Sequence, residues 1–130
     1  MNEQINVLLI EDNPGDIRLV QEMLRESSDF NINLMVAENL DKGLKLIASE
    51  YIQVILLDLN FPESHGINTF RHVKKFALTV PIIILSILSD NEIIYQAMKE
   101  GAQDYLIKGS IKNEALIRSI NYAVWCAHHV

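Results

Sequence analysis

The chain has 130 residues, of which 49% are hydrophobic and 22% charged, and its formal net charge is −6. This length predicts one domain, and the hydrophobic fraction excludes a disordered acidic segment. The apolar runs are far shorter than the roughly 20 residues of a membrane span, and no cationic segment typical of a signal peptide follows Met1. The single cysteine, Cys126, fits a reducing cytoplasm, and the negative charge argues against direct nucleic-acid binding.

Five short apolar runs alternate along the chain with longer stretches of helical period. The runs cover residues 7–10, 34–37, 54–57, 82–85 and 105–107. Three of them are apolar throughout, which is typical of strands buried on both faces of a parallel sheet. The alternation predicts an α/β fold of βαβαβαβαβα order, with a doubly wound five-stranded sheet.

Each stretch between the runs carries apolar side chains on one helical face. Asn13 and Pro14 predict the cap and the first residue of the first helix, with Asp16 at its third position. Gly101 predicts the end of the fourth helix. The predicted buried faces carry Ile17, Val20 and Leu24; Leu40, Leu44 and Ile47; Ile67, Phe70 and Val73; Ile94, Ala97 and Met98; and Ile117, Ile120 and Val124.

Polar side chains that could form a site together follow four of the apolar runs. They are Glu11 and Asp12 after the first run, Asp58 after the third, Ser86 after the fourth and Lys108 after the fifth. In a doubly wound sheet the carboxyl ends of the strands open on one edge, where ligands bind. We therefore expect three carboxylates, a hydroxyl and an ammonium group to converge there.

Three clustered carboxylates repel one another, so cations should offset their charge. Lys108 supplies one positive charge, and Mg²⁺, which prefers oxygen ligands and is often bound beside phosphate, suits the rest. Asp58 follows the central strand and is the natural nucleophile for a phosphoryl group. Glu11 and Asp12 are better placed as metal ligands.

Four segments carry a family resemblance: VLLIEDNPGD (residues 7–16), LLDLNFPESHG (56–66), PIIILS (81–86) and GAQDYLIKG (101–109). In this order and spacing they resemble the receiver domain of two-component response regulators over essentially the whole chain. The resemblance implies a flavodoxin-like (βα)5 fold with strand order 2-1-3-4-5. Residues 1–130 then form a single receiver domain, with no output domain among them.

The resemblance implies a role for each matching residue of the acidic site. Asp58 matches the phosphoacceptor, and Glu11 and Asp12 match the acidic pair that binds Mg²⁺ or Mn²⁺. Asn60 matches the position whose backbone carbonyl is the third protein ligand of the metal. The domain would catalyse only its own phosphorylation and dephosphorylation, so it is not expected to be an enzyme in the usual sense.

Three further matches concern the signal rather than the metal. Lys108 matches the lysine that pairs with the phosphate, while Ser86 and Tyr105 match the two switch residues. The implied phosphodonor is a phosphohistidine on a sensor histidine kinase or a phosphotransfer protein, and the implied output is contact with a downstream protein. A homodimer through the fourth helix, fifth strand and fifth helix is a further expectation, with Asp104 and Arg118 available for ion pairs.

The chain departs from the family pattern at three positions. Gly109 stands where many receivers have proline, and Gly permits unusual dihedral angles. Ile87 and Leu88 are apolar where the family more often has a small and a polar residue. Because such a pair would hinder the attacking water, we predict slow loss of phosphate from the phosphorylated form.

Two other classes of function compete with the phosphorylated switch. One is a receiver-like module that mediates protein contact without phosphorylation. The other is an enzyme or cofactor binder of similar fold. A flavodoxin would need a phosphate loop where Glu11 and Asp12 stand, and a haloacid-dehalogenase-type phosphatase would need a second aspartate in place of Asn60.

Overall fold

The computed structural model describes residues 4–26, 31–86 and 91–128. Its main sheet has five parallel strands in the order β2-β1-β3-β6-β7. This confirms the predicted order 2-1-3-4-5, because β6 and β7 are the fourth and fifth strands of this sheet. The strands are β1 (Gln4–Ile10), β2 (Asn31–Ala37), β3 (Val54–Asp58), β6 (Ile82–Ser86) and β7 (Asp104–Ile107).

A small hairpin, which was not predicted, follows the central strand β3. Its strands are β4 (Asn60–Phe61) and β5 (Ser64–His65), paired in antiparallel register. Phe61 is buried in the core, while Asn60 and His65 are exposed. Two-residue strands are too short to show any periodicity, so sequence patterns identify this segment only as a loop.

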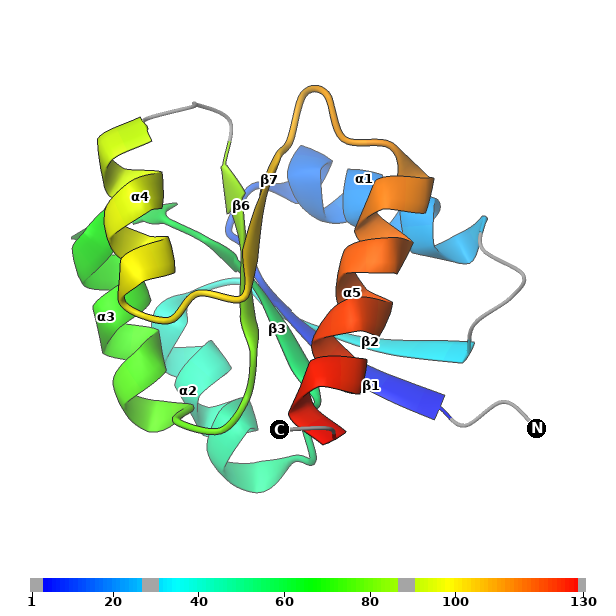
Figure 1. The fold of residues 1–130 in the computed structure, drawn as a ribbon, viewed down its shortest axis with the longest axis horizontal. Helices are drawn as coiled ribbons and strands as arrows, with labels where there is room; N and C mark the ends of the chain where they lie inside the picture. Colours follow the sequence, from blue (N-terminus) through cyan, green and yellow to red (C-terminus); the bar gives the residue numbers. More distant parts are fainter. Residues whose placement is uncertain (1–3, 27–30, 87–90, 129–130) are drawn as a thin grey trace.

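Helices cover both faces of the sheet, as the doubly wound prediction requires (Figure 1). On one face lie α1 (Pro14–Arg25) and α5 (Asn113–His128). On the other lie α2 (Leu40–Ser49), α3 (Ile67–Phe76) and α4 (Asn91–Lys99). Among the described residues, no helix is both long enough and apolar enough to cross a membrane.

The core has two halves, one on each face of the sheet, and alternate residues of each strand point into them. In β1, Leu8 and Ile10 pack with the α2–α3–α4 layer, whereas Val7 and Leu9 pack with α1 and α5. All four side chains are fully buried. The apolar stretches of β3 and β6 are buried in the same way, which confirms strands covered on both faces.

The predicted helix ends are confirmed. The Asn13 side chain accepts a hydrogen bond from the Asp16 backbone N–H at 3.0 Å, and Pro14 is the first residue of α1. Gly101, just beyond α4, has a φ of +107°, which favours glycine. One predicted core position is wrong: Met98 is 39% exposed, at the edge of the face of α4 on which Ile94 and Ala97 are buried.

Candidate functional site

The carboxyl ends of β1 and β3 bring three acidic side chains together. Glu11 directly follows β1, and Asp58 is the last residue of the adjacent strand β3. Carboxylate oxygens of Glu11, Asp12 and Asp58 all lie within 4.8 Å of one another. Glu11 and Asp58 are buried, and Asp12 is exposed. The predicted convergence of these three carboxylates is therefore present in the structure.

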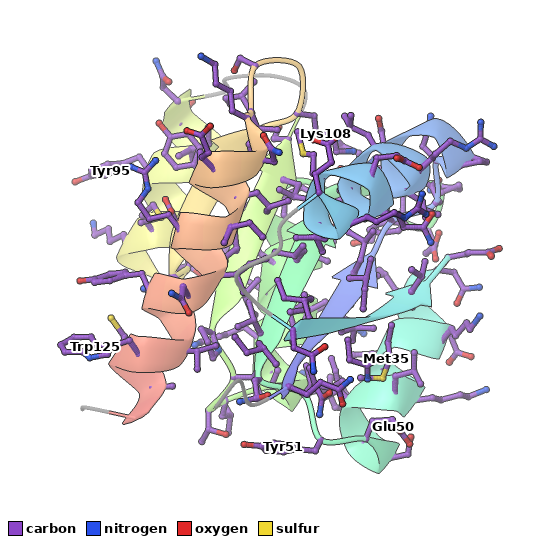
Figure 2. The ribbon with its side chains drawn as sticks, turned by 90° about the vertical axis from the view of Figure 1, so that its right-hand side faces the viewer. Met35, Glu50, Tyr51, Tyr95, Lys108 and Trp125 are labelled. Carbon is purple, nitrogen blue, oxygen red and sulfur yellow. The ribbon has the colours of Figure 1, made fainter. Side chains whose placement is uncertain are left out.

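Lys108, directly after β7, adds its ammonium group to this cluster. Its Nζ forms an ion pair with Oε1 of Glu11 and lies 3.4 Å from Oδ1 of Asp58. The same Nζ donates a 3.0 Å hydrogen bond to Oδ2 of Asp16, in the first turn of α1. Figure 2 shows Lys108 between α1 and the start of α5. Sequence reasoning gave Asp16 only a helix-terminal role and missed this contact.

Burial raises the pKa of both inner carboxyl groups, Glu11 and Asp58. It raises the pKa of Glu11 to about 7, and the nearby charge of Asp58 adds to this effect while Lys108 opposes it. Burial also raises the pKa of Asp58, although the charge of Lys108 opposes that change. Burial disfavours the charged form of Lys108, but its contacts with Glu11 and Asp16 outweigh burial and raise its pKa.

The acidic cluster suits a hard divalent cation. Within the described part of the chain, Oε1 of Glu11 is buried and accepts no well-directed hydrogen bond, despite its ion contact with Lys108. Lys108 supplies one positive charge beside three clustered carboxylates, so a further cation would reduce the repulsion among them. The clustered donors are all carboxylate oxygens, which Mg²⁺ and Mn²⁺ prefer. The residues present therefore fit such an ion.

Asn60 lies at the start of β4, two residues beyond Asp58. Its backbone N–H group lowers the pKa of Asp58 and so favours the charged carboxylate, although burial outweighs this effect. The metal-binding role expected of the Asn60 carbonyl remains a prediction.

The two expected switch residues lie on β6 and β7. Ser86 ends β6, next to Leu85, which is the register partner of Asp58 across the sheet. Its carbonyl accepts a 2.8 Å hydrogen bond from the Lys108 backbone N–H. Tyr105 lies in the edge strand β7, and its side chain is 38% exposed. Ser86 is therefore bonded to the Lys108 backbone across the sheet, Tyr105 lies three residues before Lys108 in the chain, and their switch roles remain predictions.

The three departures from the family pattern have different outcomes. Gly109 does not adopt the left-handed conformation that glycine allows, and the described residues contain no cis peptide bond. Ile87 and Leu88 lie outside the described residues, so the predicted slow loss of phosphate remains a prediction.

Comparison with known proteins agrees with this fold and site. The family model of the response regulator receiver domain matches residues 7–121. The chain is 35% identical to the probable C4-dicarboxylate response regulator DctR of Bacillus subtilis (strain 168) over 105 residues, which are 78% of this chain and 45% of that protein. A crystal structure of a response regulator receiver domain protein from Clostridium thermocellum superimposes with a TM-score of 0.80 at 26% identity, covering 92% of this chain and 94% of that one. The chain belongs to the response regulator receiver domain family.

Two of the curated relatives are regulators much longer than this chain. The chain is 28% identical to the transcriptional regulatory protein ZraR of Klebsiella oxytoca, over 82% of this chain but only 23% of that protein. The chain therefore spans about a quarter to a half of these two relatives. The expectation of no direct nucleic-acid binding finds no support here, because ZraR is named as a transcriptional regulator.

Proposed function

We propose that this chain is a phosphorylated switch, in which Asp58 accepts a phosphoryl group from a histidine kinase or a histidine phosphotransfer protein. The observation that carries the proposal is the position of Asp58: it ends the central strand β3, in the cluster with Glu11 and Asp12 and 3.4 Å from the Lys108 ammonium. Phosphoryl transfer depends mainly on such positioning and charge neutralisation.

In the proposed transfer, a carboxylate oxygen of Asp58 forms a new P–O bond. The P–N bond to the donor histidine breaks, and the imidazole leaves with that electron pair and takes a proton from solvent. The product is an acyl phosphate on Asp58. Lys108 and the Ser86 hydroxyl would then donate to the phosphoryl oxygens.

Glu11, Asp12, Asp58 and the Asn60 carbonyl are the proposed ligands of Mg²⁺, which Mn²⁺ can replace. When bound, the ion would neutralise negative charge on the carboxylates and on the phosphoryl oxygens. Asp12 is exposed and open to solvent, while Glu11 and Asp58 reach the site from the buried side.

The proposed signal is a change in the surface formed by α4, β7 and α5. Ser86 and Tyr105 would carry the change from Asp58 to this surface, with phosphate favouring one of two conformers. The same face is the proposed contact for a downstream protein or a second copy of the chain. Asp104 was expected to form ion pairs across such a dimer. Within the chain, its carboxylate accepts hydrogen bonds from Ser119 Oγ at 2.7 Å and from the Tyr105 backbone N–H at 2.8 Å.

Phosphorylation by a small donor tests this function directly. We would incubate the protein with Mg²⁺ and acetyl phosphate and measure its intact mass, beside Asp58→Asn and a chelator control. We expect one phosphoryl adduct that requires both the metal and Asp58. A folded protein that takes no adduct and binds no Mg²⁺ would support an unphosphorylated interaction module instead.

A further inference from the structure

Asp16 holds the Lys108 ammonium, although it is not one of the three clustered carboxylates. Lys108 Nζ faces Glu11, Asp16 and Asp58: its closest contact is the ion pair with Glu11 Oε1, and it donates a 3.0 Å hydrogen bond to Asp16. The distance to Asp58 is longer, at 3.4 Å. The ammonium thus lies closer to Glu11 and Asp16 than to Asp58, the residue proposed to accept phosphate.

Helix α1 fixes this contact between residues that are 92 positions apart in the chain. The Asn13 cap holds the Asp16 backbone, and Val20 and Leu24 anchor α1 in the core. The Asp16 side chain is 28% exposed, against 9% for that of Lys108. Asp16 is therefore a fixed carboxylate at the rim of the site.

The side of Lys108 that faces the core between α1 and α5 is mostly apolar. Lys108 and Asp16 border an apolar crevice between α1 and α5, lined also by Val20, Leu85 and Leu116. The free space in this crevice is about 10 Å³, enough for one water molecule at most. Among the described residues, the crevice lining adds no polar side chain beyond Lys108 and Asp16, and the ammonium is shared among the three carboxylates.

The position of the Lys108 ammonium affects cation binding, because a divalent ion would use the same oxygens of Glu11 and Asp58 that the ammonium contacts. We propose that Asp16 is a positioning residue: it binds one side of the Lys108 ammonium, which also contacts Glu11 and Asp58, and so limits how closely the ammonium approaches those two carboxylates. This inference rests on the proposed function of the site. Without the Asp16 charge, the ammonium would move closer to Glu11 and Asp58 and compete more strongly with the ion there.

A double-mutant cycle separates this role from a simple charge effect. Mn²⁺ affinity would be measured by calorimetry, without phosphodonor, for the natural chain, Asp16→Asn, Lys108→Met and the double variant. We expect Asp16→Asn to weaken Mn²⁺ binding about fivefold, the upper range for a partly exposed charge pair. With Lys108→Met present, the same change should alter affinity by about twofold at most, the direct field of one carboxylate through water.

A second measurement uses metal-free protein and does not depend on the folding of Lys108→Met. In ¹⁵N NMR spectra the Lys108 ammonium should give a signal that shifts, or exchanges faster with solvent, in Asp16→Asn. Asp41→Asn is the matched control, because Asp41 lies in the first turn of α2 and pairs only with the exposed Lys45 among the described residues. This control should leave both the ammonium signal and Mn²⁺ affinity unchanged.

The outcomes distinguish the inference from the function on which it rests. Equal weakening of Mn²⁺ binding with and without Lys108, or an ammonium signal unaffected by Asp16→Asn, would overturn the role of Asp16 and leave the cation site intact. A natural chain with no saturable Mn²⁺ binding would overturn the proposed function together with this inference.

Discussion

At the scale of single residues, the burial of Glu11 makes the stability of the metal-free protein depend on pH. Its pKa is about 7 in the folded chain and 4.5 for the free group, so the folded state holds more protons between these values. The free energy of unfolding should therefore fall as pH rises from 4.5 to 7. Over this pH range, the titration of Glu11 lowers the free energy of unfolding by up to about 3 kcal/mol.

Glu11→Gln removes this titration while keeping a neutral side chain of similar shape. We expect the variant to be more stable than the natural chain above pH 7 and to lose the decline between pH 4.5 and 7. Urea unfolding at several pH values with a chelator measures this, with the exposed Glu38→Gln as control. The same pH dependence in Glu11→Gln and the natural chain would contradict the assignment.

Residue patterns could predict Glu11, Asp12, Asp58 and Lys108, because each follows an apolar strand and the topology of the sheet brings strand ends together. The contact between Asp16 and Lys108 could not be predicted in this way. It depends on how far α1 is rotated about its axis and on the path of Lys108 from the edge strand. Neither property follows from the spacing of apolar residues.

At the scale of secondary structure, Gly43 allows α2 to pack closely on β1. A Cβ at Gly43 would lie 2.7 Å from Cδ1 of Ile10, which is fully buried. Alanine favours a helix over glycine by about 1 kcal/mol, but such overpacking costs about 1–3 kcal/mol. We therefore expect Gly43→Ala to lower the free energy of unfolding by about 1 kcal/mol.

Ile10→Val is the matched partner, because it removes the Cδ1 atom that the new Cβ would contact. In that background Gly43→Ala should be neutral or stabilising, since the helix preference of alanine remains. Chemical denaturation of the four proteins in this cycle measures the coupling. Equal effects of Gly43→Ala in both backgrounds would show that helix packing against Ile10 does not require glycine.

The strength of the apolar pattern in each strand and helix determines which of them the sequence could predict. The strands of the main sheet and their order were predictable because their apolar runs are uninterrupted and right-handed crossovers restrict the topology. The β4–β5 hairpin was not, because its pairing involves only Asn60 with His65 and Phe61 with Ser64. Met98 was misassigned because adjacent helical positions differ by about 100°, and a loose apolar pattern does not separate them.

At the scale of the whole molecule, the α4–β7–α5 face carries exposed aromatic side chains. Tyr95 is 68% exposed and Trp125 is 56% exposed, and both project from the same side in Figure 2. The Tyr122 and Trp125 rings stack, with centroids 6.2 Å apart. Large aromatic residues are enriched among the anchors of protein interfaces, so this face suits the proposed second copy.

We expect the protein to form a dimer through this face when Mg²⁺ and beryllofluoride mimic phosphorylation. Trp125→Ala should then weaken dimerisation about tenfold, the usual effect of removing a central aromatic anchor. Tyr51→Ala is the control, because Tyr51 is 68% exposed but lies between α2 and β3, away from this face. Sedimentation velocity over a range of concentrations measures the association. Equal weakening by both variants, or a monomer in the presence of the mimic, would refute dimerisation through this face and leave a different protein as its partner.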